Sequence, residues 1–216
     1  MPLFVNGCYI NSSEDYPYEL ETTYQLKYYI TSALISIECI LEPIDVMASK
    51  FENIVQYYRY YVDSLFYFLG LINDRFIYKY NKTDEDLRHK KEERIKLNRN
   101  NYQFQDGEFI VICNKMPRNI IEHLDERNVK TMLASSGVGG FNVIFEDSDS
   151  NMVAAIKSNR KLYPYNLDLK NKKVLFYNIQ AKLEEEKEID IDIFKLQREL
   201  KKLEKNVNDF AVFLKR

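Results

Sequence analysis

A chain of 216 residues is long enough for one domain with a well-buried core, and its 45% hydrophobic and 30% charged residues are typical of an ordinary globular protein. The net charge of −2 argues against a protein that grips nucleic acid through bulk positive charge, although it leaves room for a local basic cleft. The three cysteines, Cys8, Cys39 and Cys113, are odd in number and have no metal-ligand spacing. We therefore expect buried thiols in a reducing cytoplasm, with no bound metal or other cofactor.

The apolar stretches of the chain are too short for a membrane. Charged residues such as Glu38, Arg59 and Asp63 interrupt them before they reach the roughly 18 residues that a spanning helix needs. The first five residues, MPLFV, lack the basic and long apolar regions of a secretory signal. The sequence therefore predicts a cytoplasmic protein with no membrane partner.

The first eighty residues are expected to form a small β element and two helices. Residues 4–10, with Asn6-Gly7 as a turn signal, suit a short hairpin or an edge strand. From Glu19 to Glu42 apolar residues recur at intervals of three and four, which predicts a helix that Pro43 ends. Residues 44–80 predict one long helix. Its tyrosines at 57, 58, 60, 61 and 67 offer a platform for stacking RNA bases, but burial of the helix on more than one side explains them more simply.

Residues 82–106 are strongly polar, and positive side chains are interleaved with glutamates. A solvated helix with internal charge pairs is the simpler interpretation. The alternative is an arm that contacts RNA phosphates, because this segment precedes the candidate motif. The residues of that arm would be Arg88, Lys90, Lys91 and Arg94.

A β-rich segment follows at about residues 141–179. Two runs rich in β-branched and aromatic residues, 141–145 and 173–179, bracket clusters of Asp, Ser and Asn and a Tyr-Pro-Tyr break. We expect a small antiparallel sheet inserted between helices. The glycine-rich run 137–140 is interpreted as a flexible joint, because no strand precedes it and no Lys-Ser or Lys-Thr follows it, as a phosphate-binding loop requires.

The last segment, about residues 184–214, has the clearest helical pattern, with apolar residues spaced alternately by three and four. This heptad seam consists of Ile193, Leu196, Leu200, Leu203, Val207, Phe210 and Leu214. Acidic residues crowd the start of the segment and Lys201, Lys202 and Lys205 follow, an order that complements the helix dipole. A single seam packs against one surface, either the bundle of its own chain, which we favour, or a second subunit.

Only two histidines are present, and they have different surroundings. His89 lies in the charged segment without a companion at a useful spacing, so we expect it at the surface. His123 lies in the run PRNIIEHLDER, residues 117–127. On a helix, Asn119 and His123 share one face with Arg118 beside them, while the aliphatic residues of the run cluster on the other side. Pro117 suits the first turn of such a helix.

The run Arg118-Asn119-Ile120-Ile121-Glu122-His123 resembles the hallmark motif of the HEPN superfamily, which is an arginine, a polar residue that is often asparagine, three to five further residues and a histidine. The resemblance covers about ten residues, with looser agreement in architecture elsewhere. It implies a mainly α fold, with residues 1–216 forming a single antiparallel helical bundle. It also implies a homodimer in which two motifs face each other in a cleft.

Many members of this superfamily cut RNA without a metal ion. The resemblance therefore implies that His123 is a general acid or base, that Arg118 clamps the phosphoryl oxygens, and that Asn119 orients the histidine or the phosphate. Glu122 could support the site by pairing with Arg118 one turn away, or it could simply be a solvated residue of this face, which we favour. Cleavage through the 2′-hydroxyl would leave a 2′,3′-cyclic phosphate and a 5′-hydroxyl.

Two functions compete. The first is an endoribonuclease of the toxin or anti-phage defence type, with RNA as substrate and an antitoxin or defence-system protein as a possible partner. The second is a non-catalytic HEPN module that binds nucleotide or RNA or serves assembly, and an unrelated helical protein with a chance motif is a third interpretation. Asp125 stands two residues after His123, where some toxins of the family carry a tyrosine that a partner modifies, so that form of control is not expected here.

Overall fold

The computed structural model describes residues 3–5, 8–10, 16–43, 53–77, 85–114, 116–122, 141–158, 165–178 and 187–215. The chain divides into two compact units. The first consists of Met1–Leu34, Phe68–Asn114 and Arg198–Arg216, and the second of Ile35–Tyr67 and Lys115–Gln197. Three helices contribute residues to both units: α1 (Tyr16–Leu41), α3 (Ile54–Phe76) and α8 (Ile193–Leu214). The described residues are mainly helical, as the sequence predicts, and they include one small four-stranded sheet.

The first unit is helical apart from a small hairpin. Strands β1 (Leu3–Val5) and β2 (Cys8–Ile10) pair antiparallel, and the pairing of Val5 with Cys8 leaves two residues between them. The predicted hairpin is therefore confirmed. Strand β2 lies next to helix α4 (Glu85–Asn101), which occupies most of the polar segment predicted to be helical.

Aromatic rings fill the core of the first unit. The rings of Phe76 and Phe104 stack with centroids 4.1 Å apart, and those of Phe104 and Phe109 stack at 4.4 Å. Tyr102 packs edge-on against Phe210 of α8 at 5.2 Å. All seven residues of the predicted heptad seam of α8 are buried. The seam is thus covered by the chain itself, which is the interpretation that the sequence favoured.

The second unit contains a mixed sheet with the strand order β3 (Phe141–Ile144), β4 (Tyr165–Asp168), β5 (Lys173–Asn178) and β6 (Lys187–Asp192). Strands β4, β5 and β6 are antiparallel neighbours, but β3 runs parallel to β4. The prediction of a purely antiparallel sheet is therefore wrong. Helix α7 (Ser150–Ser158) lies between β3 and β4 in the chain and supplies the crossover that a parallel pair requires.

The sheet also extends beyond the predicted insertion. Strand β6 occupies Lys187–Asp192, where the sequence was expected to be helical from about residue 184, and α8 begins at Ile193. The local pattern explains the strand, because Ile189 and Ile191 alternate with the exposed Glu188, Asp190 and Asp192. A period of two residues suits a strand with one covered face.

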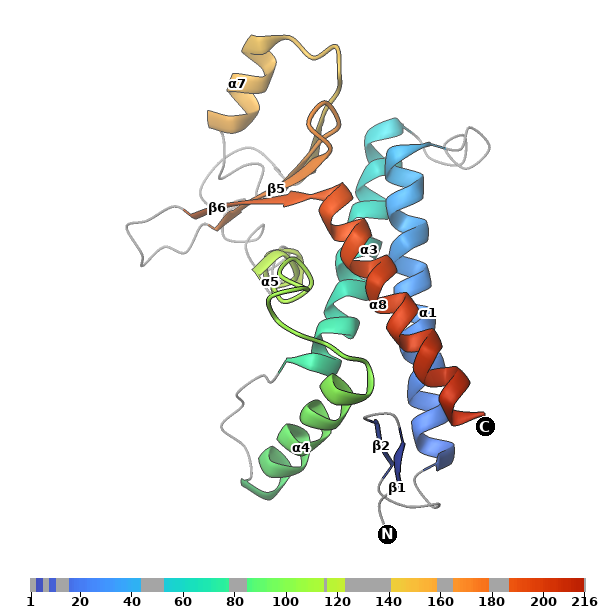
Figure 1. Ribbon diagram of the computed structural model, residues 1–216. Coiled ribbons are helices and arrows are strands. Elements are labelled where there is room, and N and C mark those ends of the chain that lie inside the picture. The colour runs from blue at the N-terminus through green and yellow to red at the C-terminus, as the bar shows by residue number, and fades with distance from the viewer. Residues whose placement is uncertain are drawn as a thin grey trace. The chain divides into compact units, whose positions relative to one another are not determined.

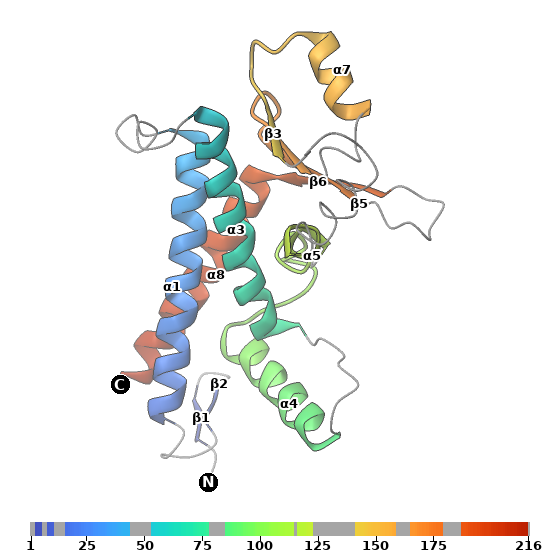
Figure 2. The ribbon, with the colours of Figure 1, turned by 180° about the vertical axis from the view of Figure 1, so that it is seen from behind.

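Both faces of the sheet are covered by helices. On one face, Leu175 and Tyr177 of β5 form a cluster with Ile156 of α7. On the other, Phe176 packs edge-on against Phe66 of α3, with ring centroids 4.8 Å apart. Helix α5 (Met116–Glu122) also contacts β5, and it lies on the side of the sheet opposite α7 (Figures 1 and 2).

The tyrosines of α3 divide between core and surface. Tyr57, Tyr58 and Tyr61 are buried, and the Tyr57 hydroxyl donates a hydrogen bond of 3.0 Å to the carbonyl of Cys39. Tyr60 and Tyr67 remain 55% and 60% exposed. Burial therefore accounts for three of the five tyrosines. Helix α3 starts at Ile54, and residues 44–52 of the predicted long helix lie outside the described residues.

Candidate functional site

Helix α5 carries the first part of the sequence motif. It begins at Met116, so Pro117 lies in its first turn as predicted. Pro117 and Ile120 are buried, and Ile121 is half-buried. At 100° per residue these residues occupy one side of the helix, and positions 118, 119 and 122 fall on the remaining arc.

The sheet supports this helix. Strand β5 contacts α5 on the face that α3 also covers, so the buried side of α5 has a fixed partner within the second unit. The side chains of Arg118, Asn119 and Glu122 lie outside the described residues, as does the whole of His123. The same holds for Asp125 and for the glycine-rich run 137–140.

Helix α4 carries the four cations predicted to contact RNA. Some of its charged side chains form ion pairs with other residues of the same helix. Arg88 binds Glu92 one turn away at 3.2 Å. The second histidine, His89, is 74% exposed at its side chain, as expected, and lies 3.5 Å from the Glu93 carboxylate. Lys90 and Lys91 are exposed and form no ion pair within the described part of the chain.

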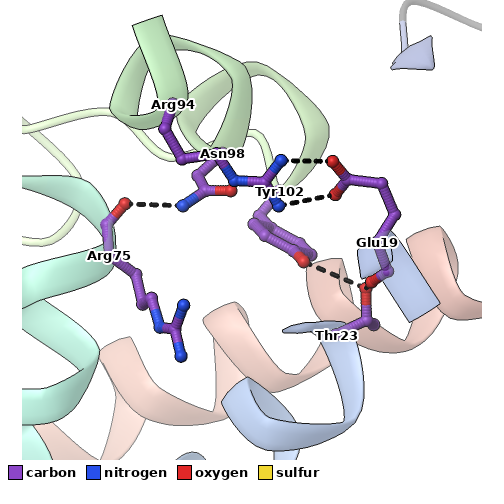
Figure 3. A network of polar contacts seen from close by, with 6 residues as sticks. All are labelled: Glu19, Thr23, Arg75, Arg94, Asn98 and Tyr102. Atoms are coloured by element: carbon purple, nitrogen blue, oxygen red, sulfur yellow. Dashed lines mark hydrogen bonds and ion pairs between the residues drawn. The ribbon is translucent and has the colours of Figure 1, made fainter. Parts of the chain in front are cut away.

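The fourth cation, Arg94, is the centre of a polar network between α4 and α1 (Figure 3). Its two terminal nitrogens donate to the two carboxylate oxygens of Glu19, whose side chain is only 2% exposed. The guanidinium also lies 4.7 Å from the ring centroid of Tyr18. Such a two-pronged pair is among the stronger polar contacts in proteins, and it directs Arg94 toward its own chain.

Two further contacts extend this network, one to α1 and one to α3 (Figure 3). The Tyr102 hydroxyl lies 3.0 Å from the Thr23 hydroxyl, which donates to the carbonyl of Glu19 at 2.7 Å. Burial raises the pKa of Tyr102 to about 12, so this phenol stays protonated at neutral pH. The Asn98 side chain donates to the carbonyl of Arg75 at 2.9 Å. The network joins α4 to both α1 and α3.

A second polar cluster lies in the other unit, between α3 and the sheet. The buried Tyr165 of β4 donates a hydrogen bond of 2.5 Å to the carboxylate of Asp63, and the Arg59 guanidinium lies 3.6 Å from the same carboxylate. Burial raises the pKa of Asp63, an effect that the bond from Tyr165 and the charge of Arg59 partly oppose. Sequence reasoning missed this cluster, because Asp63 and Tyr165 are 102 residues apart.

A third contact shapes the segment that leads toward the motif. The buried carboxylate of Glu199 in α8 accepts hydrogen bonds from the backbone amides of Val111, at 2.9 and 3.1 Å, and of Ile112, at 3.0 Å. The Asn73 amide donates to the carbonyl of Ile112 at 2.7 Å. Two helices thus satisfy the backbone of a segment without regular structure. The only sequence signal was a glutamate beside a heptad seam.

Within the described ranges, no three His, Cys, Asp or Glu side chains gather closely enough to hold a metal ion. No helix in the same ranges combines the length and the apolar character that crossing a bilayer requires. Comparisons of the chain with protein-family models, with curated proteins and with solved structures found no match. A functional proposal must therefore come from the residues themselves.

Proposed function

We propose that the chain is a metal-independent endoribonuclease of the HEPN type, with Arg118, Asn119 and His123 as its catalytic residues. The burial pattern of α5 supports the proposal most directly. Pro117 and Ile120 fix one side of the helix in the protein, and the positions of Arg118 and Asn119 fall on the other arc. The proposal assumes that the helical geometry of α5 extends by one residue to His123, which would then lie on the same side of the helix as Asn119.

The proposed chemistry requires two proton transfers and stabilisation of negative charge. A histidine removes the proton of the RNA 2′-hydroxyl, and the oxygen attacks the adjacent phosphorus. The bond from phosphorus to the 5′-oxygen breaks, and the leaving oxygen takes a proton from an imidazolium. Arg118 stabilises the charge on the phosphoryl oxygens through its planar fork, and Asn119 orients the reacting groups. The products are a 2′,3′-cyclic phosphate and a 5′-hydroxyl.

One chain contributes one arginine and one histidine of the motif, whereas the two proton transfers need a base and an acid. We propose that a two-fold homodimer supplies both, with the motifs of the two subunits facing each other. The seam of α8 is covered by its own chain, so the proposed interface uses another surface. A toxin or anti-phage defence role in the cytoplasm, controlled by an antitoxin or another protein of the system, belongs to the same proposal.

The test uses the purified chain, total RNA and excess EDTA. We expect RNA fragments with cyclic phosphate ends, and we expect His123→Ala and Arg118→Ala each to slow cleavage by about 10²–10⁴-fold, the usual loss for a general acid–base catalyst. The chain provides a matched control, because His89→Ala removes the other histidine, which is exposed and pairs only with Glu93 among the described residues. Sedimentation of the same preparation at micromolar concentration measures the oligomeric state.

Four outcomes would contradict parts of the proposal. Equal cleavage by His123→Ala and the parent would show that the site is elsewhere, and cleavage lost in EDTA but restored by Mg²⁺ would show a carboxylate site. A stable monomer would remove the two-subunit mechanism. If the parent binds RNA and cuts nothing, the non-catalytic HEPN module becomes the better description.

A further inference from the structure

The exposed side of α8 carries a compact row of positive charge. Arg198, Lys201, Lys202 and Lys205 are all exposed, and we call them the basic arc. At 100° per residue they lie within about 100° of the helix circumference, and they span about 10 Å along its axis. The buried Leu200 and Leu203 occupy the opposite side of the same helix.

Neighbouring acids leave most of this charge uncompensated. Lys202 binds Glu108 at 2.7 Å. Arg198, Lys201 and Lys205 form no ion pair with any residue in the described ranges. Glu199, next to Arg198 in the chain, points its carboxylate at backbone amides of the first unit, as described above. Glu204 and Asp209, the other acids of this part of α8, form no ion pair with the arc among the described residues. The basic arc therefore concentrates positive charge on a protein whose net charge is −2.

The helix dipole does not explain these cations. The sequence suggested that Lys201, Lys202 and Lys205 complement the negative end of the helix, but α8 continues to Leu214 and has no basic residue in its last turn. Lys205 lies more than two turns before that end, and the favourable effect is confined to the last turn. Lys201 and Lys205, at a spacing of four, instead repel each other on the helix surface. This repulsion lowers the stability of the helix slightly, so the clustering of these cations needs an explanation other than the helix dipole.

We infer that the basic arc binds the phosphate backbone of single-stranded RNA. Its cations follow one another at axial intervals of about 1.5–4.5 Å, so that one strand laid along the helix meets several of them. Three of the four are lysines, whose ammonium groups contact phosphates as point charges, and the arc should therefore bind without reading sequence. A membrane surface suits it less well, since an amphipathic helix that lies on lipid needs a free apolar face, and α8 has buried its own.

The inference rests on the proposed function for the choice of RNA, so its test measures binding and does not depend on cleavage. The protein carries His123→Ala, and the probe is a fluorescein-labelled oligouridine of 20 nucleotides, followed by anisotropy between 50 and 200 mM salt. In this background Lys201→Glu/Lys205→Glu should weaken binding about tenfold or more. The slope of log K against log salt should become shallower by about 1.4, because two phosphate contacts are lost at about 0.7 each.

Net charge is the obvious confounding factor, and the chain offers a matched control. Lys27→Glu/Lys170→Glu changes the net charge by the same amount at two exposed lysines, on α1 and on the turn between β4 and β5. We expect this variant to bind like the His123→Ala parent, and melting curves should show that all variants remain folded. Equal weakening in both double variants would overturn the inference, and so would a parent that binds vesicles of anionic lipid but not the RNA.

The two proposals fail separately. Absence of RNA cleavage together with binding that depends on the basic arc refutes the ribonuclease and supports the arc. Cleavage that requires His123 together with unchanged binding by Lys201→Glu/Lys205→Glu refutes the arc and supports the ribonuclease.

Discussion

Substitution of Arg94 by methionine tests whether this residue serves the fold or RNA. Methionine preserves much of the side-chain volume but leaves the Glu19 carboxylate buried without its cation. Removing one partner of a buried ion pair usually costs about 3–5 kcal/mol. Because the Arg94 side chain is 27% exposed, water can reach the remaining carboxylate, and we place the loss at the lower end, about 3 kcal/mol. For a chain of this size such a loss lowers the melting temperature by about 6–12 °C.

The matched control is the double variant Glu19→Met/Arg94→Met, which removes both charges together. Replacing a whole buried pair by apolar side chains is often close to neutral, so we expect this variant to recover most of the stability, to within about 1 kcal/mol of the parent. Urea unfolding followed by circular dichroism gives the free energies, and the two single variants complete the thermodynamic cycle.

The contrary result is specific. If Arg94→Met unfolds like the parent but binds RNA about tenfold more weakly, then Arg94 contacts phosphate and the pair with Glu19 contributes little to stability. Lys90→Ala and Lys91→Ala, at the exposed part of the same helix, provide the comparison for binding. A structural Arg94 should affect melting more than binding, and these two lysines should show the opposite order.

Two further substitutions test contacts that join distant parts of the chain. Glu199→Ala removes the acceptor of two backbone amides and should lower the free energy of unfolding by about 3 kcal/mol, whereas Glu199→Gln keeps one oxygen and should cost about 1 kcal/mol; equal losses in urea unfolding would contradict this assignment. Burial raises the pKa of Asp63 in the folded state, so the ionised carboxylate weakens the fold above that pKa. The free energy of unfolding should therefore rise as the pH falls through the folded-state pKa toward the pKa of the unfolded state. Asp63→Asn still accepts the bond from Tyr165 and should remove this part of the pH dependence, so an unchanged dependence between pH 4 and 7 in the variant would refute the assignment.

The parts of the fold that follow from local patterns could be predicted from the sequence. The apolar spacing of α8 predicts its buried seam, and each of the seven seam residues is buried. The Asn6-Gly7 signal predicts the pairing of Val5 with Cys8. The pair of Arg88 with Glu92 follows from a spacing of four residues on one helix. In each case the partners are close in sequence, so that the pattern alone determines the contact.

The sheet shows where local patterns stop being sufficient. Strand direction depends on the connection, and helix α7 has only nine residues between Ser150 and Ser158. Only two of its apolar residues, Val153 and Ile156, pack in the cluster on the sheet, and two positions are too few to separate a short helix from a loop. Strand β6 was missed for a different reason. Because the apolar pattern of the following helix is strong, its start was predicted at about residue 184, before its true start at Ile193. The alternation of Ile189 and Ile191 with acidic residues nevertheless indicates a strand.

Polar contacts over long separations could not be predicted. Glu19 is 75 residues from Arg94, and a glutamate in the first turn of an amphipathic helix normally faces water. The tertiary fold reverses that expectation, since burial of Glu19 is tolerable only with a guanidinium opposite both of its oxygens. Candidate sites drawn from single residues of one type therefore mix structural charges with functional ones.

The charges of this chain show why the surroundings of each cation matter more for RNA binding than the net charge of the protein. Helices α4 and α8 are both rich in lysine and arginine, yet their cations have different neighbours. On α4 Glu92 follows Arg88 by one turn and Glu93 follows His89 by one turn on the same side of the helix, so that the helix neutralises part of its own charge. On α8 Glu199 is buried against backbone amides, Asp209 follows Lys205 by one turn without forming an ion pair with it, and three of the four cations of the basic arc have no acidic partner among the described residues. A polyanion that approaches the protein meets the local potential of such a surface before it meets the net charge, because charges farther away than about 10 Å are screened at physiological salt. A net charge of −2 therefore excludes a protein coated in positive charge, but it does not exclude one helix that holds RNA.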